Sequence, residues 1–195
     1  MLEELIEVQV PIRLARPEDA MQIHLLIEQF ADRDEMLHRS TEEVLQSLGD
    51  YSVAYSGDEV VGCCAVQVCT DDLAEIKGLA VAPSQQGKGL GRRLVEACEE
   101  QARLQGVPRV FCLTYVPEFF GKMGYHLVDK VSLPHKVWNE CLFCNKYPIC
   151  GEEAMVKRFD GGTDPLVAMH SVGADGRPVT LLRILGVTGH PIIRR

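Results

Sequence analysis

The sequence lacks any apolar run approaching the roughly 20 residues needed to cross a bilayer. Its first ten residues contain three glutamates and no basic residue, so they lack the basic start of a secretory signal. Positive charge is also scarce, because 28 acidic residues face 20 basic ones and the net charge is −8. General nucleic-acid binding needs a basic face, which this balance argues against. We therefore expect a cytoplasmic protein without membrane or nucleic-acid partners, and we leave homodimer formation open.

The composition is that of a globular protein with one core. A chain of 195 residues is long enough for one buried core and short for two ordinary domains. With 46% hydrophobic and 25% charged residues, it is neither fibrous nor wholly disordered. Eight cysteines are many for this length, yet five lie inside apolar segments, where reduced buried thiols are the simpler interpretation. Those five are Cys63, Cys64, Cys69, Cys98 and Cys112.

The order of periodic segments predicts an α/β fold. A strand at 11–15 precedes a helix that begins at Pro17, and Ser40 with Glu43 forms a capping box for a second helix. The other predicted elements are strands at 51–55, 60–68 and 73–81, a helix from Leu90 that ends by Gly106, a strand at 109–114, a short helix at 117–123 and strands at 125–128 and 154–159.

A glycine-rich loop, Gln86 to Gly91, separates the strand 73–81 from an amphipathic helix. Glycines let the backbone approach an anion, and the N–H groups at a helix start point toward it. The dinucleotide pattern would need a glycine where Leu94 stands, and the triphosphate-binding pattern would need serine or threonine where Gly89 stands. Another family of phosphate-binding loops must therefore be considered.

The spacing of Gln86, Gly89 and Gly91, after a strand that ends in Leu-Ala-Val-x-Pro, resembles the acetyl-CoA motif of the GCN5-related N-acetyltransferase (GNAT) family. The order of elements over residues 11–130 is also the order of that family. The resemblance implies a GNAT fold: a mixed, mostly antiparallel central sheet with flanking helices and splayed parallel strands at the acyl-CoA site. It implies an acetyltransferase domain at 11–159, with a cysteine-containing excursion at 131–153. Residues 160–195 are then a glycine-rich appendage, whose order we leave open.

Positions in the family motif carry the predicted acyl-CoA site. The strand end offers backbone groups to the pantetheine arm, and the loop surrounds the pyrophosphate. The predicted residues are Leu79, Ala80, Val81, Gln86, Gly87, Lys88, Gly89, Leu90, Gly91 and Arg92.

The reaction implied by the resemblance is direct attack of an acceptor amine on the thioester in a ternary complex. An ammonium has no lone pair, so a general base must take its proton. Glu75 matches the position of the family's glutamate base, and the backbone N–H of Val81, at the expected strand bulge, matches its oxyanion donor. Even spacing predicts that Glu75, Lys77, Leu79 and Val81 point to one face. A solvated strand carboxylate is the alternative for Glu75, and Phe120 stands where the family often has a tyrosine acid.

Residues 37–40, 72–77 and 109–114 resemble the acetyltransferase domain of bacterial N-acetylglutamate synthases, and residues 133–138 resemble the short stand-alone synthase-like acetyltransferases. This implies L-glutamate as the acceptor, N-acetylglutamate as the product and a place in arginine biosynthesis. Arg39 offers a bidentate fork for one carboxylate and Lys77 a cation for the other, with ordinary surface charge as the alternative for both. Acetylation of protein N-termini, lysines or polyamines stays open, as does a non-catalytic acyl-CoA-binding regulator.

Three later cysteines have a spacing that can grip a metal ion. Cys141 and Cys144 form a Cys-x-x-Cys pair with Cys150 close by, and His135 or His126 could complete a structural zinc site. Three cysteines fall short of a tetrahedral set, so we favour reduced structural thiols. We predict no catalytic metal.

Overall fold

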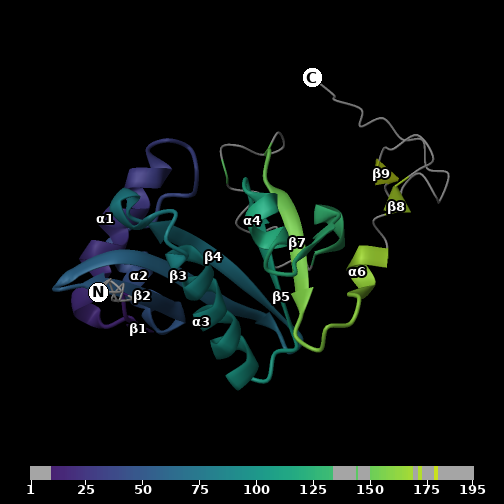
Figure 1. The fold of residues 1–195 in the computed structure, drawn as a ribbon, viewed down its shortest axis with the longest axis horizontal. Coiled ribbons are helices and arrows are strands. Elements are labelled where there is room, and N and C mark those ends of the chain that lie inside the picture. The colour runs from purple at the N-terminus through teal and green to yellow at the C-terminus, as the bar shows by residue number, and fades with distance from the viewer. Residues whose placement is uncertain (1–9, 134–143, 145–149, 169–170, 173–177, 180–195) are drawn as a thin grey trace, which may run out of the picture. The chain divides into compact units, whose positions relative to one another are not determined.

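The computed structural model describes residues 10–133, 144, 150–168, 171–172 and 178–179 (Figure 1). The chain forms two compact units, residues 1–110 and 111–195. Each unit is described by itself. The domain limits expected from the sequence stay a prediction.

The first unit is built on four antiparallel strands in the order β1-β2-β3-β4 (Figure 1). They are β1 (Ile12–Leu14), β2 (Tyr51–Ser56), β3 (Glu59–Thr70) and β4 (Leu73–Val81). Gly57, with φ of 62°, lies in the tight turn between β2 and β3, where a positive φ favours glycine. The predicted limits of β4 are confirmed to the residue, and the strands with their helices confirm the α/β class.

Helices α1 (Ala20–Ala31), α2 (Thr41–Gln46) and α3 (Leu90–Leu104) belong to the same unit, with three short 3-10 helices. The short helices are η1 (Pro17–Asp19), η2 (Leu48–Asp50) and η3 (Pro83–Gln85). The capping box predicted for α2 is confirmed. The Ser40 hydroxyl accepts from the Glu43 N–H at 3.2 Å, and the Glu43 carboxylate accepts from the Ser40 N–H at 2.7 Å.

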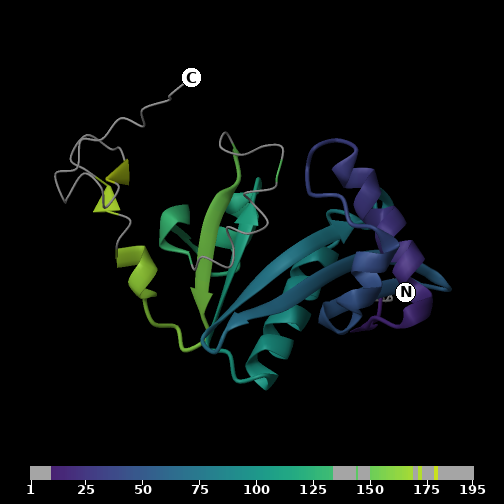
Figure 2. The same ribbon diagram turned by 180° about the vertical axis from the view of Figure 1, so that it is seen from behind.

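The two faces of strands β2 to β4 pack against different helices. One face carries Tyr51, Val53, Cys63 and Ala65, which share a buried core with residues of α1 and α2; we call it the α1 face. The opposite face carries Ser52, Gly62 and Cys64 and packs against α3, so we call it the α3 face. Figure 1 shows α3 in front of these strands, and Figure 2 shows them from behind.

Close packing holds α3 on its face. An ideal Cβ at Gly62 would lie 2.9 Å from Leu94 Cδ1, closer than real Cβ atoms come to a neighbour. Glycine at this position therefore lets the first half of α3 approach β3. Farther along the helix, the Gln101 side-chain amide donates to Ser52 Oγ at 2.7 Å. The start of α3, where the glycine-rich loop ends, is thus fixed against the sheet.

The second unit contains the antiparallel pair β6 (His126–Val128) and β7 (Glu153–Arg158), and helix α4 (Pro117–Gly121) packs against it. Its other elements are most of β5 (Arg109–Thr114), η4 (Lys130–Ser132), α6 (Pro165–Ala168), β8 (Ser171–Val172) and β9 (Pro178–Val179). The last three of these are not predicted by the sequence pattern. In the part of the chain that the structure describes, no helix has the length and apolarity to span a membrane.

Candidate functional site

The glycine-rich loop leads from the end of β4 into α3. Gly87 and Gly89 have φ of 74° and 77°, a conformation that favours glycine, and Gly89 is the N-cap residue of α3. Two side-chain hydrogen bonds stabilise the loop. Gln86 Nε2 donates to the Val81 carbonyl and Lys88 Nζ donates to the Ser84 carbonyl, both at 2.9 Å. A Cβ at Gly87 or Gly89 would meet nothing within 4 Å. The backbone at the start of a 15-residue helix is therefore open to an approaching anion.

A bulge interrupts β4 next to this loop. Cys63 pairs with Ala80 and Ala65 with Lys77, so both Gly78 and Leu79 lie opposite Cys64. Gly78 has φ of 61°, which explains a glycine inside the strand. An isolated glycine in a strand pattern is the sequence signal that could have located this bulge.

The bulge corrects one prediction. Lys77 and Ala80 pair with Ala65 and Cys63 and therefore lie on the α1 face, whereas Val81 pairs with Gly62 and lies on the α3 face. The expectation that Val81 shares a face with Glu75 and Lys77 is wrong, because the extra residue shifts the alternation by one. The bulge itself is at Gly78 and Leu79 rather than at Val81.

Three polar residues of β3 and β4 lie together on the α1 face. Glu75 pairs directly with Gln67, and Lys77 Nζ donates to Gln67 Oε1 at 2.6 Å. Glu75 and Lys77 are both half-buried and two residues apart on one strand, so their Cα atoms are about 7 Å apart. The predicted base and one predicted acceptor residue are thus neighbours. Gln67 was not predicted, although a polar residue within an apolar strand was a signal for it.

Tyr51 bridges this group and the helices. Tyr51 pairs with Ala65, which pairs with Lys77, so the three form a row across the α1 face. Tyr51 is only 3% exposed, and its hydroxyl lies 3.7 Å from an ideal Cβ at Gly78. The buried ring therefore reaches the bulge, a role that sequence reasoning missed because it depends on the register of three strands.

Charged groups from separate elements act on this row. Burial raises the pKa of Tyr51 far above its usual range, and the Arg39 guanidinium partly opposes that rise, so Arg39 acts on the Tyr51 hydroxyl. Burial also raises the pKa of Asp50, and Lys77 opposes the rise. Arg39 is 24% exposed and lies 3.9 Å from Glu43 at the start of α2. Of the two cations predicted from the sequence, Lys77 thus lies on the α1 face, and Arg39 acts through its charge on Tyr51 of the same face.

Phe120, at the position where the family often has a tyrosine acid, lies in α4 of the second unit. It is buried and packs edge-on against Phe119 and Tyr125, with ring centroids 5.0 and 5.2 Å away. An apolar ring in such a cluster has no proton to give.

The cysteine-rich segment is described only in part. Cys141 and His135 lie outside the described residues. Cys144 and Cys150 are half-buried and not in disulfides, and Cys150 Sγ donates to Glu152 Oε2 at 3.4 Å. A structural zinc there stays a prediction.

Comparisons with known proteins agree with the loop motif. A model of the acetyltransferase (GNAT) family matches residues 18–125. An uncharacterised N-acetyltransferase of Chlorobaculum tepidum is 42% identical over 146 residues, which cover 75% of this chain and 94% of that protein. An amino-acid acetyltransferase of Mycobacterium tuberculosis is 31% identical over 141 residues, 71% of this chain and 79% of that protein.

A solved structure has the same fold. It is N-acetylglutamate synthase from Neisseria gonorrhoeae, complexed with coenzyme A and N-acetyl-glutamate. The TM-score is 0.69 at 28% identity, and the match covers 78% of this chain but 35% of the synthase. The resemblance inferred from the loop is confirmed: the chain belongs to the acetyltransferase (GNAT) family.

Proposed function

We propose that this N-acetyltransferase transfers an acetyl group from acetyl-CoA to the amine of a small dicarboxylic amino acid, L-glutamate. The observation that carries the proposal is that Glu75 and Lys77 lie together on the α1 face, where the charge of Arg39 also acts on Tyr51. Two cations associated with one face of a chain with net charge −8 suit two carboxylates. The names of an amino-acid acetyltransferase relative and of an N-acetylglutamate synthase with the same fold support it.

The glycine-rich loop is the proposed site of the coenzyme A pyrophosphate. The open backbone at Gly87 and Gly89, the N–H groups at the start of α3 and the side chains of Lys88 and Arg92 supply positive potential there. The backbone from Leu79 to Val81 would hold the pantetheine arm. The interrupted ladder at the bulge supports this role, because a bulge leaves strand backbone groups without a regular partner.

The proposed chemistry uses the α1 face. Glu75 takes a proton from the acceptor ammonium, directly or through a water, and the amine then attacks the thioester carbonyl carbon. The new C–N bond forms, the C–S bond breaks and the sulfur leaves as a thiolate. A backbone N–H at the end of β4, that of Val81, would donate to the oxyanion. A thiolate is a fair leaving group, which is compatible with phenylalanine at position 120.

Replacing a loop glycine tests the coenzyme site. Gly89→Val should weaken coenzyme A binding at least tenfold, about 1.4 kcal/mol, because a branched side chain would fill the space the pyrophosphate needs. Gly106→Val is the matched control, since Gly106 has φ of 79°, equally open space and a place at the other end of α3. Calorimetric titration with coenzyme A measures both. Unchanged binding in folded Gly89→Val would place the coenzyme elsewhere.

Removing the carboxylate tests the base. Glu75→Gln keeps the shape but cannot accept a proton, so kcat should fall about 10²-fold or more with the acetyl-CoA KM unchanged. Glu59→Gln, an exposed strand carboxylate on β3, is the control. Steady-state rates over a range of pH check this, and a Glu75→Gln enzyme as fast as wild type would remove Glu75 from the mechanism.

Removing the Arg39 guanidinium tests the acceptor site. Arg39→Ala should raise the glutamate KM by roughly 30- to 150-fold, the equivalent of about 2–3 kcal/mol for a lost charge-assisted pair. The acetyl-CoA KM should not change. Arg33→Ala is the control, because Arg33 belongs to the same connection between α1 and α2 but pairs with Glu35 at the surface. An unchanged glutamate KM in Arg39→Ala would refute this role.

A further inference from the structure

The backbone of Arg39 is held by two side chains of α1. His24 Nδ1 lies 2.7 Å from the Arg39 carbonyl oxygen. A carbonyl only accepts, so Nδ1 must carry the proton and donate it. The carboxylate of Glu28, one helical turn further on, accepts from the Arg39 backbone N–H. Both polar backbone groups of one residue are therefore bound from the same helix.

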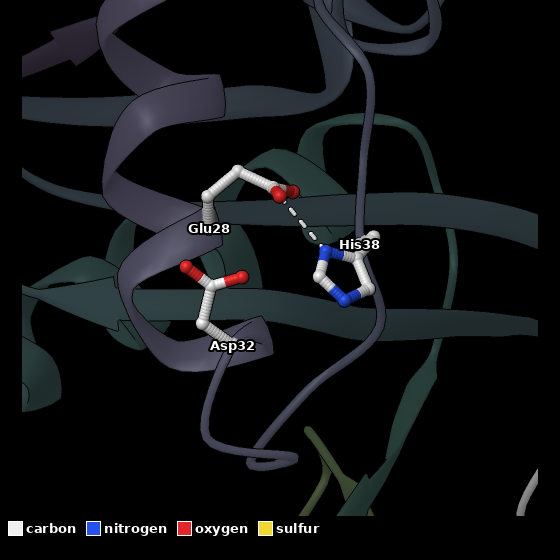
Figure 3. Close-up of side chains that lie close together, drawn as sticks. All are labelled: Glu28, Asp32 and His38. Atoms are coloured by element: carbon white, nitrogen blue, oxygen red, sulfur yellow. Dashed lines mark hydrogen bonds and ion pairs between the residues drawn. The ribbon is translucent and has the colours of Figure 1, made fainter.

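A second contact strengthens the attachment. Figure 3 shows Glu28 and Asp32 at the end of α1 with the imidazole of His38 directed toward them. His38 Nδ1 lies 2.8 Å from Glu28 Oε2. This hydrogen bond, with the charges of Asp32 and Asp34, raises the pKa of His38, and it lowers the pKa of Glu28. A hydrogen bond to an ionised carboxylate is charge-assisted, which strengthens this contact.

The segment that follows Arg39 is fixed too. The N–H of Ser40 donates to Glu43 within the capping box of α2. Arg39 thus stands between the contacts to α1 and the start of α2. Most of the connection around it is exposed, at residues 32–35, 37 and 38. Such contacts at one position within an otherwise exposed connection indicate that this residue must be placed accurately.

We propose that Glu28 and His24 are positioning residues for the acceptor site, which fix the backbone of Arg39 so that its guanidinium is presented at Tyr51 on the α1 face. This rests on the proposed function, in which Arg39 holds an acceptor carboxylate. A bidentate fork works only within a narrow range of distance and direction, and a long side chain can keep that geometry only from a fixed base. Glu28 and His24 touch no reacting atom in this account and act through Arg39.

A double-mutant cycle separates positioning from direct binding. Glu28→Ala should raise the glutamate KM about tenfold while kcat and the acetyl-CoA KM change less than about twofold. In an Arg39→Ala background, Glu28→Ala should add no further change, because the group through which it acts is gone. Glu59→Ala removes one exposed carboxylate from the start of β3 and serves as the matched charge control. Calorimetric coenzyme A affinity reports whether each variant is folded, and Glu28→Gln replaces Glu28→Ala if the latter does not fold.

The outcomes distinguish the positioning role of Glu28 and His24 from the acceptor role of Arg39. Positioning is overturned if Arg39→Ala raises the glutamate KM and neither Glu28 variant does, and also if the effects of Glu28 and Arg39 add in full. In both cases the proposed acceptor site stands. If Arg39→Ala leaves the glutamate KM unchanged, the acceptor site itself is rejected and positioning with it. A tenfold effect of Glu28→Ala that disappears without Arg39 supports both, and the same pattern for His24→Ala confirms that the two side chains work together.

Discussion

The bulge at Gly78 and Leu79 is the constraint on which the site depends. One extra residue in β4 shifts the alternation of side chains by one, so residues at even spacing before and after it lie on opposite faces. Before the bulge, Glu75 and Lys77 share the α1 face with Tyr51. After it, Val81 lies on the α3 face, where the strand leads into the glycine-rich loop and the start of α3. In our account the acceptor belongs to the first face and the coenzyme to the second, with the reacting carbon near the break.

The acceptor side depends on charge that is held in place. The charge of Arg39 acts on Tyr51 from the connection between two helices, whereas Lys77 lies in the same row as Tyr51 on β4. Burial raises the pKa of Tyr51, and the charge of Arg39 partly opposes that rise. Hydrogen bonds from His24 and Glu28 of α1 hold the backbone of Arg39, and the capping box of α2 holds the residue that follows it. In our proposal, function therefore depends on contacts that touch no substrate.

Much of this architecture could be predicted from the sequence, since its signals are local. Asp71, Asp72 and Pro83 bound β4, Ser40 with Glu43 begins α2, and the spacing of glycines identifies the loop. The register is not local. The row from Tyr51 through Ala65 to Lys77 exists only once three strands are paired, and the bulge changes which residues share a face. Arg39 lies 15 positions after His24 and 11 positions after Glu28, and no periodic pattern in the sequence reports contacts of this kind.

The central claim is that the acceptor carries two carboxylates, and the most direct measurement is release of free coenzyme A from acetyl-CoA with a panel of amines. The panel contains glutamate, aspartate, glutamine, a lysine peptide and a polyamine. We expect kcat/KM to be highest for glutamate and at least about tenfold lower for glutamine, which keeps the shape but loses one charge-assisted contact, about 1.4 kcal/mol or more. Rapid acetylation of the lysine peptide or the polyamine, with no activity on acidic amino acids, would contradict it.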